Sequence, residues 1–241
     1  MFRHQGKNRT LKHNLQIAAV LSFVAGIVNV TGYLAIKQLT TNVTGHFALF
    51  IYDVAHLDFW KGTIYLLYIF SFLAGSFSSS MLIETFSKNR KLNVFTLPTV
   101  VESLILISIA VISNFAEMQY PNLIACLLLF AMGLQNAYVT KISNATVRTT
   151  HLTGLFTDLG IDLSHLFFQK LAHQRKKLKS AIKLRVYIIS FFFTGGLVGG
   201  FLYSKLNMEL NTLIFAVIIL LISLFYDDFR YKVIKKQRSH R

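Results

Sequence analysis

Six apolar runs of about twenty residues each constrain this chain more than any other feature of its sequence. They cover approximately residues 15–36, 62–86, 94–114, 121–139, 184–203 and 210–225. About twenty helical residues, at ~1.5 Å each, span the ~30 Å of hydrocarbon in a bilayer. One soluble domain has no use for six apolar helices of that length. We therefore predict an all-α, polytopic membrane protein with six transmembrane helices in a single membrane domain, residues 1–241.

The positions of the basic residues predict how the spans are oriented. The net charge of +15 would suggest nucleic-acid binding in a soluble chain. Here the lysines and arginines gather at the ends of apolar runs, in both tails and at residues 88–91 and 175–179. All four groups lie on one side of the bilayer if both termini are cytoplasmic, as the positive-inside rule requires. We expect a multi-pass protein of the bacterial cytoplasmic (inner) membrane, in contact with lipid and with no nucleic-acid partner.

Two shorter apolar segments, residues 43–59 and 152–168, are copies of one another. Without a gap, Thr44-Gly45 aligns with Thr153-Gly154, Asp53 with Asp162 and His56 with His165. The preceding spans align as well, Gly26 to Asn29 with Gly133 to Asn136. Each half, residues 15–114 and 121–229, then consists of a span, a Thr-Gly helix and two further spans. Three crossings per half require the second copy to be inverted. The sequence thus predicts a 3+3 inverted repeat whose two Thr-Gly helices are re-entrant or interfacial.

The matched positions supply a candidate solute site. A helix that starts at Thr44 or Thr153 would have a hydroxyl N-cap and then a glycine, and its free N–H groups favour an anion or a polar oxygen. Polar groups within spans should face the protein interior or a cavity. The predicted substrate-binding residues are Asn29, Thr44, Gly45, Asn136, Arg148, Thr149, Thr153 and Gly154. The alternatives are ordinary helix caps, lipid-phosphate binding by Arg148 and interhelical hydrogen bonds from the two asparagines.

Acidic residues and histidines recur at helical spacing in the two copies. Asp53 and His56, like Asp162 and His165, are three residues apart, and Asp158 stands one turn before Asp162. On one helical face such groups relay protons or form a structural pair at the membrane surface. Two further polar residues within spans are Gln135 and Glu102. The single cysteine, Cys126, and the lack of a zinc-type spacing indicate neither a metal nor another cofactor.

Two stretches resemble the YoaK-type family, which comprises bacterial six-span membrane proteins with no assigned function. They are Gly133-Leu134-Gln135-Asn136-Ala137 with residues 147–154 and 157–159, and Ala25-Gly26 with Val43-Thr44-Gly45. The resemblance covers nearly the whole chain and implies the same topology, but it supplies no substrate. Family members often carry an aspartate where this chain has Asn29 and an asparagine where it has His46.

The leading functional interpretation is a small transporter or channel for a polar or anionic solute bound between the inverted repeats. The first alternative is a membrane scaffold that binds a partner or anionic lipid through the basic segment 170–185. The second is a membrane-embedded enzyme that uses Asp158, Asp162 and His165, although no catalytic motif is present. Glycine-rich faces at Gly75 and residues 195–200 suit either packing within one chain or a homo-oligomer.

Overall fold

The described part of the chain, in a computed structural model, is a bundle of α-helices without strands. It comprises residues 9–87, 94–115, 120–169 and 171–239, with the side chains of the last helix described as far as Tyr226. The helices are α1 (Leu11–Ile36), α2 (Val43–Ala55), α3 (Phe59–Phe86), α4 (Thr96–Phe115), α5 (Pro121–Ser143), α6 (Leu152–Phe168), α7 (Ala172–Ser204), the short 3-10 helix η2 (Glu209–Asn211) and α8 (Thr212–Ser239). The predicted all-α fold is therefore confirmed.

Six of the described helices are long and apolar enough to cross a membrane. They are α1, α3, α4, α5, α7 and the η2–α8 segment from Glu209 to Tyr226. Each corresponds to one predicted apolar run, and the ends of these segments agree within four residues, except that α7 begins twelve residues before the predicted residue 184. Both prolines act as predicted, since Pro121 opens α5 and Pro98 lies in the first turn of α4, where a missing N–H breaks no helical bond.

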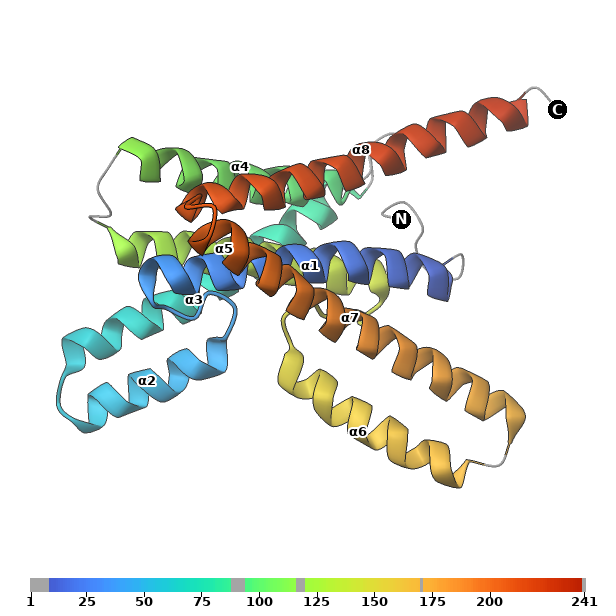
Figure 1. Cartoon of the computed structure of the whole chain (residues 1–241), viewed down its shortest axis with the longest axis horizontal. Helices are drawn as coiled ribbons and strands as arrows, with labels where there is room; N and C mark the ends of the chain where they lie inside the picture. The colour runs from blue at the N-terminus through green and yellow to red at the C-terminus, as the bar shows by residue number, and fades with distance from the viewer. Residues whose placement is uncertain (1–8, 88–93, 116–119, 170, 240–241) are drawn as a thin grey trace.

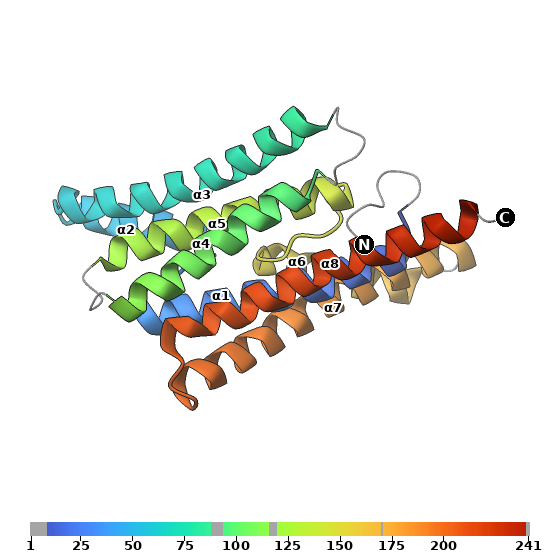
Figure 2. The ribbon, with the colours of Figure 1, turned by 90° about the horizontal axis from the view of Figure 1, so that it is seen from above.

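Helices α1 and α5 form the centre of the bundle, and the other spans surround them (Figures 1 and 2). Within the most apolar part of each helix, 61% of the residues of α1 and α5 are buried, against 39% in α4 and α8 and 22% in α3 and α7. Helix α1 packs against α7 and α8, while α5 packs against α3 and α4. Helices α4 and α8 also contact each other, as do α1 and α5. The two halves of the chain thus make corresponding contacts.

The closest helix contacts occur where glycines bring two backbones together. A Cβ atom on Gly195 of α7 would lie 2.0 Å from the carbonyl oxygen of Phe23 in α1. The contact between α3 and α5 has the same form, because a Cβ on Gly75 would lie 2.1 Å from the carbonyl oxygen of Phe130. Helices in lipid gain little from burial of apolar surface, so close van der Waals contact between small residues holds them together.

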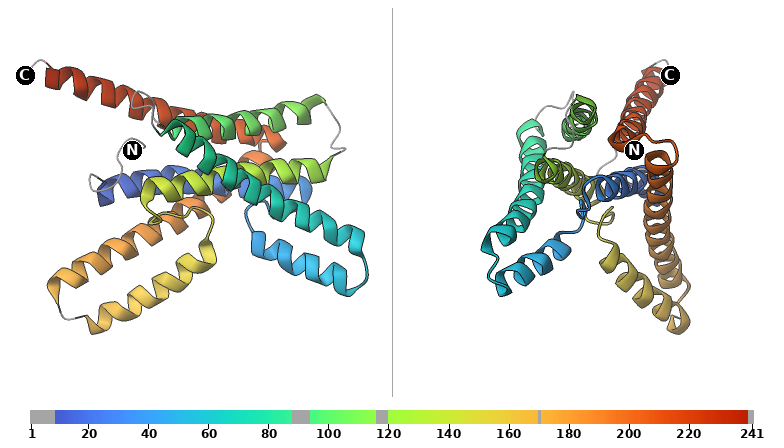
Figure 3. Two further views of the ribbon diagram at one scale, coloured as in Figure 1. Left: turned by 180° about the vertical axis from the view of Figure 1, so that it is seen from behind. Right: turned by 60° about the vertical axis from the view of Figure 1, so that its left-hand side comes forward.

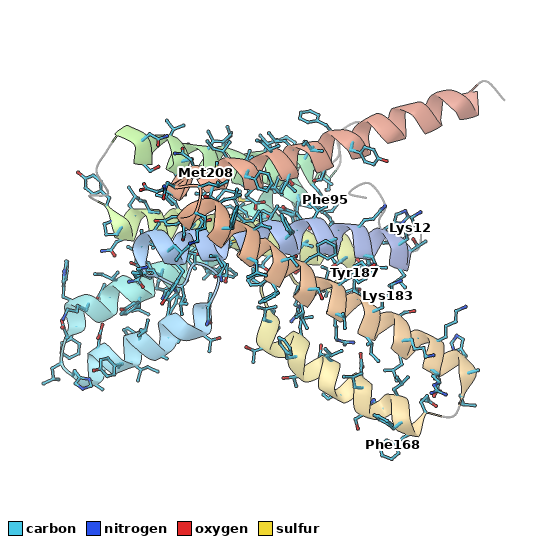
Figure 4. All side chains as sticks on the ribbon, in the orientation of Figure 1. Lys12, Phe95, Phe168, Lys183, Tyr187 and Met208 are labelled. Carbon is cyan, nitrogen blue, oxygen red and sulfur yellow. The ribbon has the colours of Figure 1, made fainter. Side chains whose placement is uncertain are left out.

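Helices α2 and α6 lie outside this bundle, each paired with the first half of the next span. Helix α2 packs along α3, and α6 packs along α7. The resulting arms, α2–α3 and α6–α7, project from the same face of the bundle but toward its opposite ends (Figures 1 and 3). Both short helices begin near the middle of the molecule and run outward, and Phe168 lies at the far tip of the second arm (Figure 4).

Two sequence-based boundaries need correction. The first Thr-Gly helix ends at Ala55, because the chain turns through Leu57 with a positive φ of 62° and restarts as α3 at Phe59. The basic segment 170–185, predicted as a cytoplasmic loop, is helical from Ala172 onward and forms the first half of α7. Lysine, arginine and glutamine are good helix formers, so a run of them extends a helix readily. Lys170 and residues 88–91 lie outside the described part of the chain.

The glycine contacts generate a stability prediction. We expect Gly195→Ala to lower the apparent unfolding temperature of the purified protein, since its Cβ would overlap the backbone of α1 and overpacking costs about 1–3 kcal/mol. The control is Gly200→Ala on the same helix, whose Cβ would meet the side chain of Val30 at an ordinary 3.4 Å. Thermal unfolding in detergent measures both. Equal unfolding temperatures for the two variants would contradict the proposed contact.

Candidate functional site

The start of α2 is capped by Asn42 rather than by the predicted Thr44. The Asn42 side-chain oxygen accepts a hydrogen bond of 3.0 Å from the backbone N–H of Gly45. Thr44 is therefore the second residue of the helix, and its side chain is exposed. An asparagine is a better N-cap than a threonine because its longer side chain reaches the first-turn N–H groups from an extended backbone. The start of α2 still lies within two residues of the predicted position.

The start of α6 differs because its N-cap residue is His151, not the predicted Thr153. The His151 side chain makes no capping hydrogen bond, although its ring lies against Gly154, where a Cβ would meet the Nε2 atom at 2.3 Å. Thr153 is the second residue of the helix and is exposed, as is Arg148 in the preceding loop. The start of α6 thus has an arginine in the preceding loop and a hydroxyl in its first turn. The N-cap side chain forms no hydrogen bond with the N–H groups of that turn.

The loops before the two short helices fold back into the bundle. Thr40 and Thr149, which occupy equivalent positions in the two copies, are both fully buried. The hydroxyl of Thr40 donates to the carbonyl oxygen of Val28 at 3.5 Å, whereas the hydroxyl of Thr149 has no hydrogen-bond partner. A buried polar atom without a partner is costly, so the site around Thr149 has an unfilled hydrogen bond.

The two intramembrane asparagines behave differently despite their matched positions. The Asn29 side-chain oxygen accepts a hydrogen bond of 2.7 Å from the hydroxyl of Thr41, which ties α1 to the loop before α2. The Asn136 amide donates instead to the carbonyl oxygen of Met132 in its own helix, at 2.8 Å. Asn29 therefore lies beside the start of α2, while no hydrogen bond links Asn136 to the start of α6 in the described chain.

His46 is a buried polar residue in the first turns of α2. Its Nε2 lies 2.6 Å from the carbonyl oxygen of Leu39, which can only accept, so Nε2 carries the proton. Burial lowers the pKa of His46, opposed by that backbone hydrogen bond, and the ring is therefore neutral at neutral pH. Nδ1 is consequently an acceptor, and it is buried without a partner. The ring contacts Tyr68 at a centroid distance of 5.0 Å.

The acidic residues of α6 form an ion-pair cluster with Arg185 of α7. The guanidinium donates to Asp162, and its second nitrogen lies 3.4 Å from a carboxylate oxygen of Asp158. Arg185 and Asp162 are mostly buried, with side-chain exposures of 22% and 14%. His165 is exposed and has no such bond. The cluster fastens α6 to α7, and both carboxylates are engaged by one arginine, whose single positive charge balances one of the two negative charges.

Asp53 and His56 form no hydrogen bond to each other among the described residues. Helix α2 ends at Ala55 and His56 is its C-cap residue, whose Nδ1 donates to the carbonyl oxygen of Tyr52 at 2.8 Å. A shared role for the two residues stays a prediction. The described residues contain no group of three or more His, Cys, Asp or Glu side chains that could hold a metal ion.

Two residues of this region were missed as site candidates. His46 aligns with Leu155 of the second segment, and both side chains are buried. A histidine aligned with a leucine could have indicated a buried polar residue from the sequence. Arg185 was grouped with the exposed basic run. Its partners lie 23 and 27 residues earlier, and no local pattern indicates such a pairing.

Comparison with known proteins identifies relatives of the chain. A family model described as "Protein of unknown function (DUF1275)" matches residues 17–226. The chain is also similar to the UPF0700 transmembrane protein YoaK of Bacillus subtilis (strain 168), with 26% identity over 186 residues, which is 76% of this chain and 80% of that protein. No solved structure matches it. A transmembrane relative and six long apolar helices agree, so this chain is a multi-pass membrane protein in contact with the lipid bilayer.

The ion-pair cluster predicts how α6 responds to mutation. We expect Arg185→Gln to loosen α6 by leaving Asp162 unpaired, so that amide hydrogen exchange in residues 152–168 becomes roughly 5–30 times faster, the factor for about 1–2 kcal/mol. Residues 43–55 of α2 should exchange at an unchanged rate. Lys183→Gln, which removes an exposed cation near the ring of Tyr187, is the matched control and should leave α6 unaffected. Unchanged exchange in Arg185→Gln would show that the cluster does not hold the helix.

Proposed function

This chain belongs to the family described as protein of unknown function (DUF1275), and we propose that it acts as a small transporter or channel for a polar or anionic solute. The resemblance to the YoaK-type family indicated by its motifs is confirmed. The solute binds between the first turns of α2 and α6. The observation that carries the proposal is that both short helices begin near the middle of the molecule and run outward toward opposite ends (Figure 1).

An inverted repeat explains this arrangement. Corresponding contacts are made by α1–α7 and α5–α3, by α2–α3 and α6–α7, and by α1–α8 and α5–α4. The glycine contacts correspond as well: a Cβ on Gly26 would meet the Phe192 carbonyl oxygen at 2.1 Å, and one on Gly133 would meet that of Phe72 at 2.2 Å. Such matched contacts support a common ancestral half. Inverted repeats with interrupted helices are the build of many transporters, whose sites lie near the midplane between the halves.

The direction of the short helices, rather than their lengths, supports the re-entrant alternative over the interfacial one (Figure 3). Helix α2 has 13 residues and α6 has 17, which correspond to about 20 Å and about 25 Å. Each covers part of the bilayer thickness, and each extends beside the bundle toward one end (Figure 3). In re-entrant helices of this kind, the positive N-terminal ends of the dipoles lie at the depth where a solute is held.

The chemistry at the two helix starts favours an anionic group. Arg148 adds an exposed positive charge near the start of α6, and Thr153 adds a hydroxyl. Asn42 already occupies one N–H at the start of α2, so α2 offers fewer free donors than α6. We therefore assign the solute's charged group to α6 and its polar remainder to α2. At Gly45 and Gly154 the missing Cβ leaves room for the side chains of Leu39 and His151, which a Cβ would meet at 2.7 Å and 2.3 Å, and Thr149 contributes a buried hydroxyl.

The scaffold alternative also has a specific observation in its favour. The first half of α7 carries exposed cations at Arg175, Lys176, Lys177 and Lys179, beside an α6 helix with exposed phenylalanines. Basic residues beside apolar ones suit an anionic membrane surface, and positive-inside anchoring accounts for them without any further function. The enzyme alternative loses support, because Asp158 and Asp162 are engaged with Arg185 and His165 has no acidic partner among the described residues.

The proposed orientation has both termini in the cytoplasm of a bacterial cell, and reporter fusions test it. We expect green fluorescent protein fused after residue 241 to fluoresce, and alkaline phosphatase fused after residue 206 to be active, since the phosphatase folds only outside the cytoplasm. A phosphatase fused after residue 170 should be inactive and serves as the control. The reverse pattern would place the basic segments outside and contradict the proposed orientation.

A ligand screen of the intact protein in detergent tests the solute site. The probes are inorganic anions, amino acids, sugars and metal ions, and a binding solute at about 100 times its Kd stabilises the fold by ~2.7 kcal/mol. We expect Thr44→Val, Thr153→Val and Arg148→Ala to remove this stabilisation. Flux of the same solute into proteoliposomes would then establish transport.

The control for that screen is Thr157→Val. Its hydroxyl lies one turn beyond Thr153 and already donates to the Thr153 carbonyl oxygen at 3.0 Å, so its loss should not affect solute binding. Stabilisation by anionic lipids alone, abolished when residues 175–179 are neutralised, would replace the transporter proposal with the scaffold one.

A further inference from the structure

A buried carboxyl group in α4 plays no part in the proposed solute site. Glu102 has no exposed surface and lies seven residues into a membrane-spanning helix. The hydroxyl of Tyr138 in α5 donates to its Oε2 at 2.8 Å. The other carboxyl oxygen, Oε1, is buried and has no hydrogen-bond partner. Ionisable residues inside a membrane are costly and mark ion or proton paths in many membrane proteins.

Among the described side chains, no cation pairs with Glu102. Helix α4 packs against α3, α5, α8 and η2. Their titratable groups among the described side chains are Lys61, Tyr65, Tyr68, Glu84, Cys126, Tyr138, Lys141, Glu209 and Tyr226, and of these only Tyr138 bonds to Glu102. Lys141, the nearest cation along α5, is paired with Glu84 at 2.6 Å. A buried carboxylate without a cation is strongly disfavoured, so the group holds a proton in this arrangement.

Polar groups continue from Glu102 toward the centre of the bundle. Gln135 lies three residues before Tyr138 and thus on the same face of α5. Its amide donates to the carbonyl oxygen of Leu21 in α1 at 2.9 Å, and its own side-chain oxygen is buried without a partner. Glu102 and Gln135 thus each carry a buried side-chain oxygen without a hydrogen-bond donor. Donors for both would come from water or from an exchanging proton.

The depth of these groups is consistent from both helices. Glu102 is six residues from the start of α4, or about 9 Å, while Tyr138 and Gln135 are five and eight residues from the end of α5, or about 8 and 12 Å. The start of α4 and the end of α5 lie on the side predicted to be cytoplasmic. The polar groups thus lie at a depth from these helix ends of about one third of the ~30 Å hydrocarbon thickness of a bilayer.

We propose that Glu102 is a proton-binding site that exchanges its proton with water on the predicted cytoplasmic side, with Tyr138 as the residue that positions the carboxyl group. The site takes up one proton at Oε1 and releases the same proton to water. The Tyr138 hydroxyl stabilises the deprotonated form through its bond to Oε2. The inference is independent of the solute site, because neither residue lies at the start of α2 or α6.

Infrared spectroscopy of the intact protein in liposomes tests the proposal without any solute. A protonated carboxyl group has its own C=O stretching band, and we expect one band that Glu102→Gln removes. The band should lose intensity as the pH rises between about 5 and about 9, a range in which buried glutamates titrate. In D₂O it should shift within minutes as the proton exchanges. A control substitution, Glu84→Gln at an exposed carboxylate, should leave the band unchanged.

Tyr138→Phe separates a positioning role from a structural one. The variant keeps the ring that packs in the core but removes the donor to Oε2, so the Glu102 band should change frequency and persist to higher pH. It also serves as the second variant if Glu102→Gln does not fold. A band that neither titrates nor shifts in D₂O, or the absence of any band that depends on Glu102 or Tyr138, would overturn the proposal.

Discussion

Backbone contact at glycines is the interaction on which the rest of this structure depends. Where α1 crosses α7, and where α3 crosses α5, a single methyl group would overlap a carbonyl oxygen of the facing helix. Lipid surrounds the spans and is as apolar as their side chains, so shape and close contact hold the bundle together. The first halves of α3 and α7 diverge from the bundle and carry α2 and α6 with them (Figures 1 and 3).

The starts of α2 and α6 are held in place by different means. At α2, Asn42 caps the helix, the hydroxyl of Thr41 bonds to Asn29 of α1, and His46 reaches back to the loop. At α6, the corresponding cap bond is absent, and Arg185 of α7 fastens the helix further along. Two copies of one motif have therefore diverged in their polar contacts while they keep the same packing. This asymmetry gives one helix start more free donors than the other.

Buried polar side chains of α5 link it to two of its neighbouring helices. Gln135 joins α5 to α1, and Tyr138 joins α5 to α4 through Glu102. Hydrogen bonds between helices contribute modestly to stability in a membrane, but an unfilled donor or acceptor there is costly. One side-chain oxygen of Glu102 and one of Gln135 lack a hydrogen-bond partner, so at these two residues the bundle is less stable than an apolar core would be. Strain of this kind is retained at functional sites more often than elsewhere.

The sequence by itself determined the membrane class, the six spans and the two extra short helices, because each rests on a local property. The thickness of the hydrocarbon layer sets the length of a span, and a run of about twenty apolar residues in the sequence indicates such a span. It also placed both helix starts within two residues, since threonine and glycine are local signals. Only the tertiary structure decided which polar groups meet. Arg185 reaches Asp162 across 23 residues, and Tyr138 reaches Glu102 across 36. Such pairs depend on how helices pack against one another, and that packing leaves no mark in the spacing of the residues that it brings together.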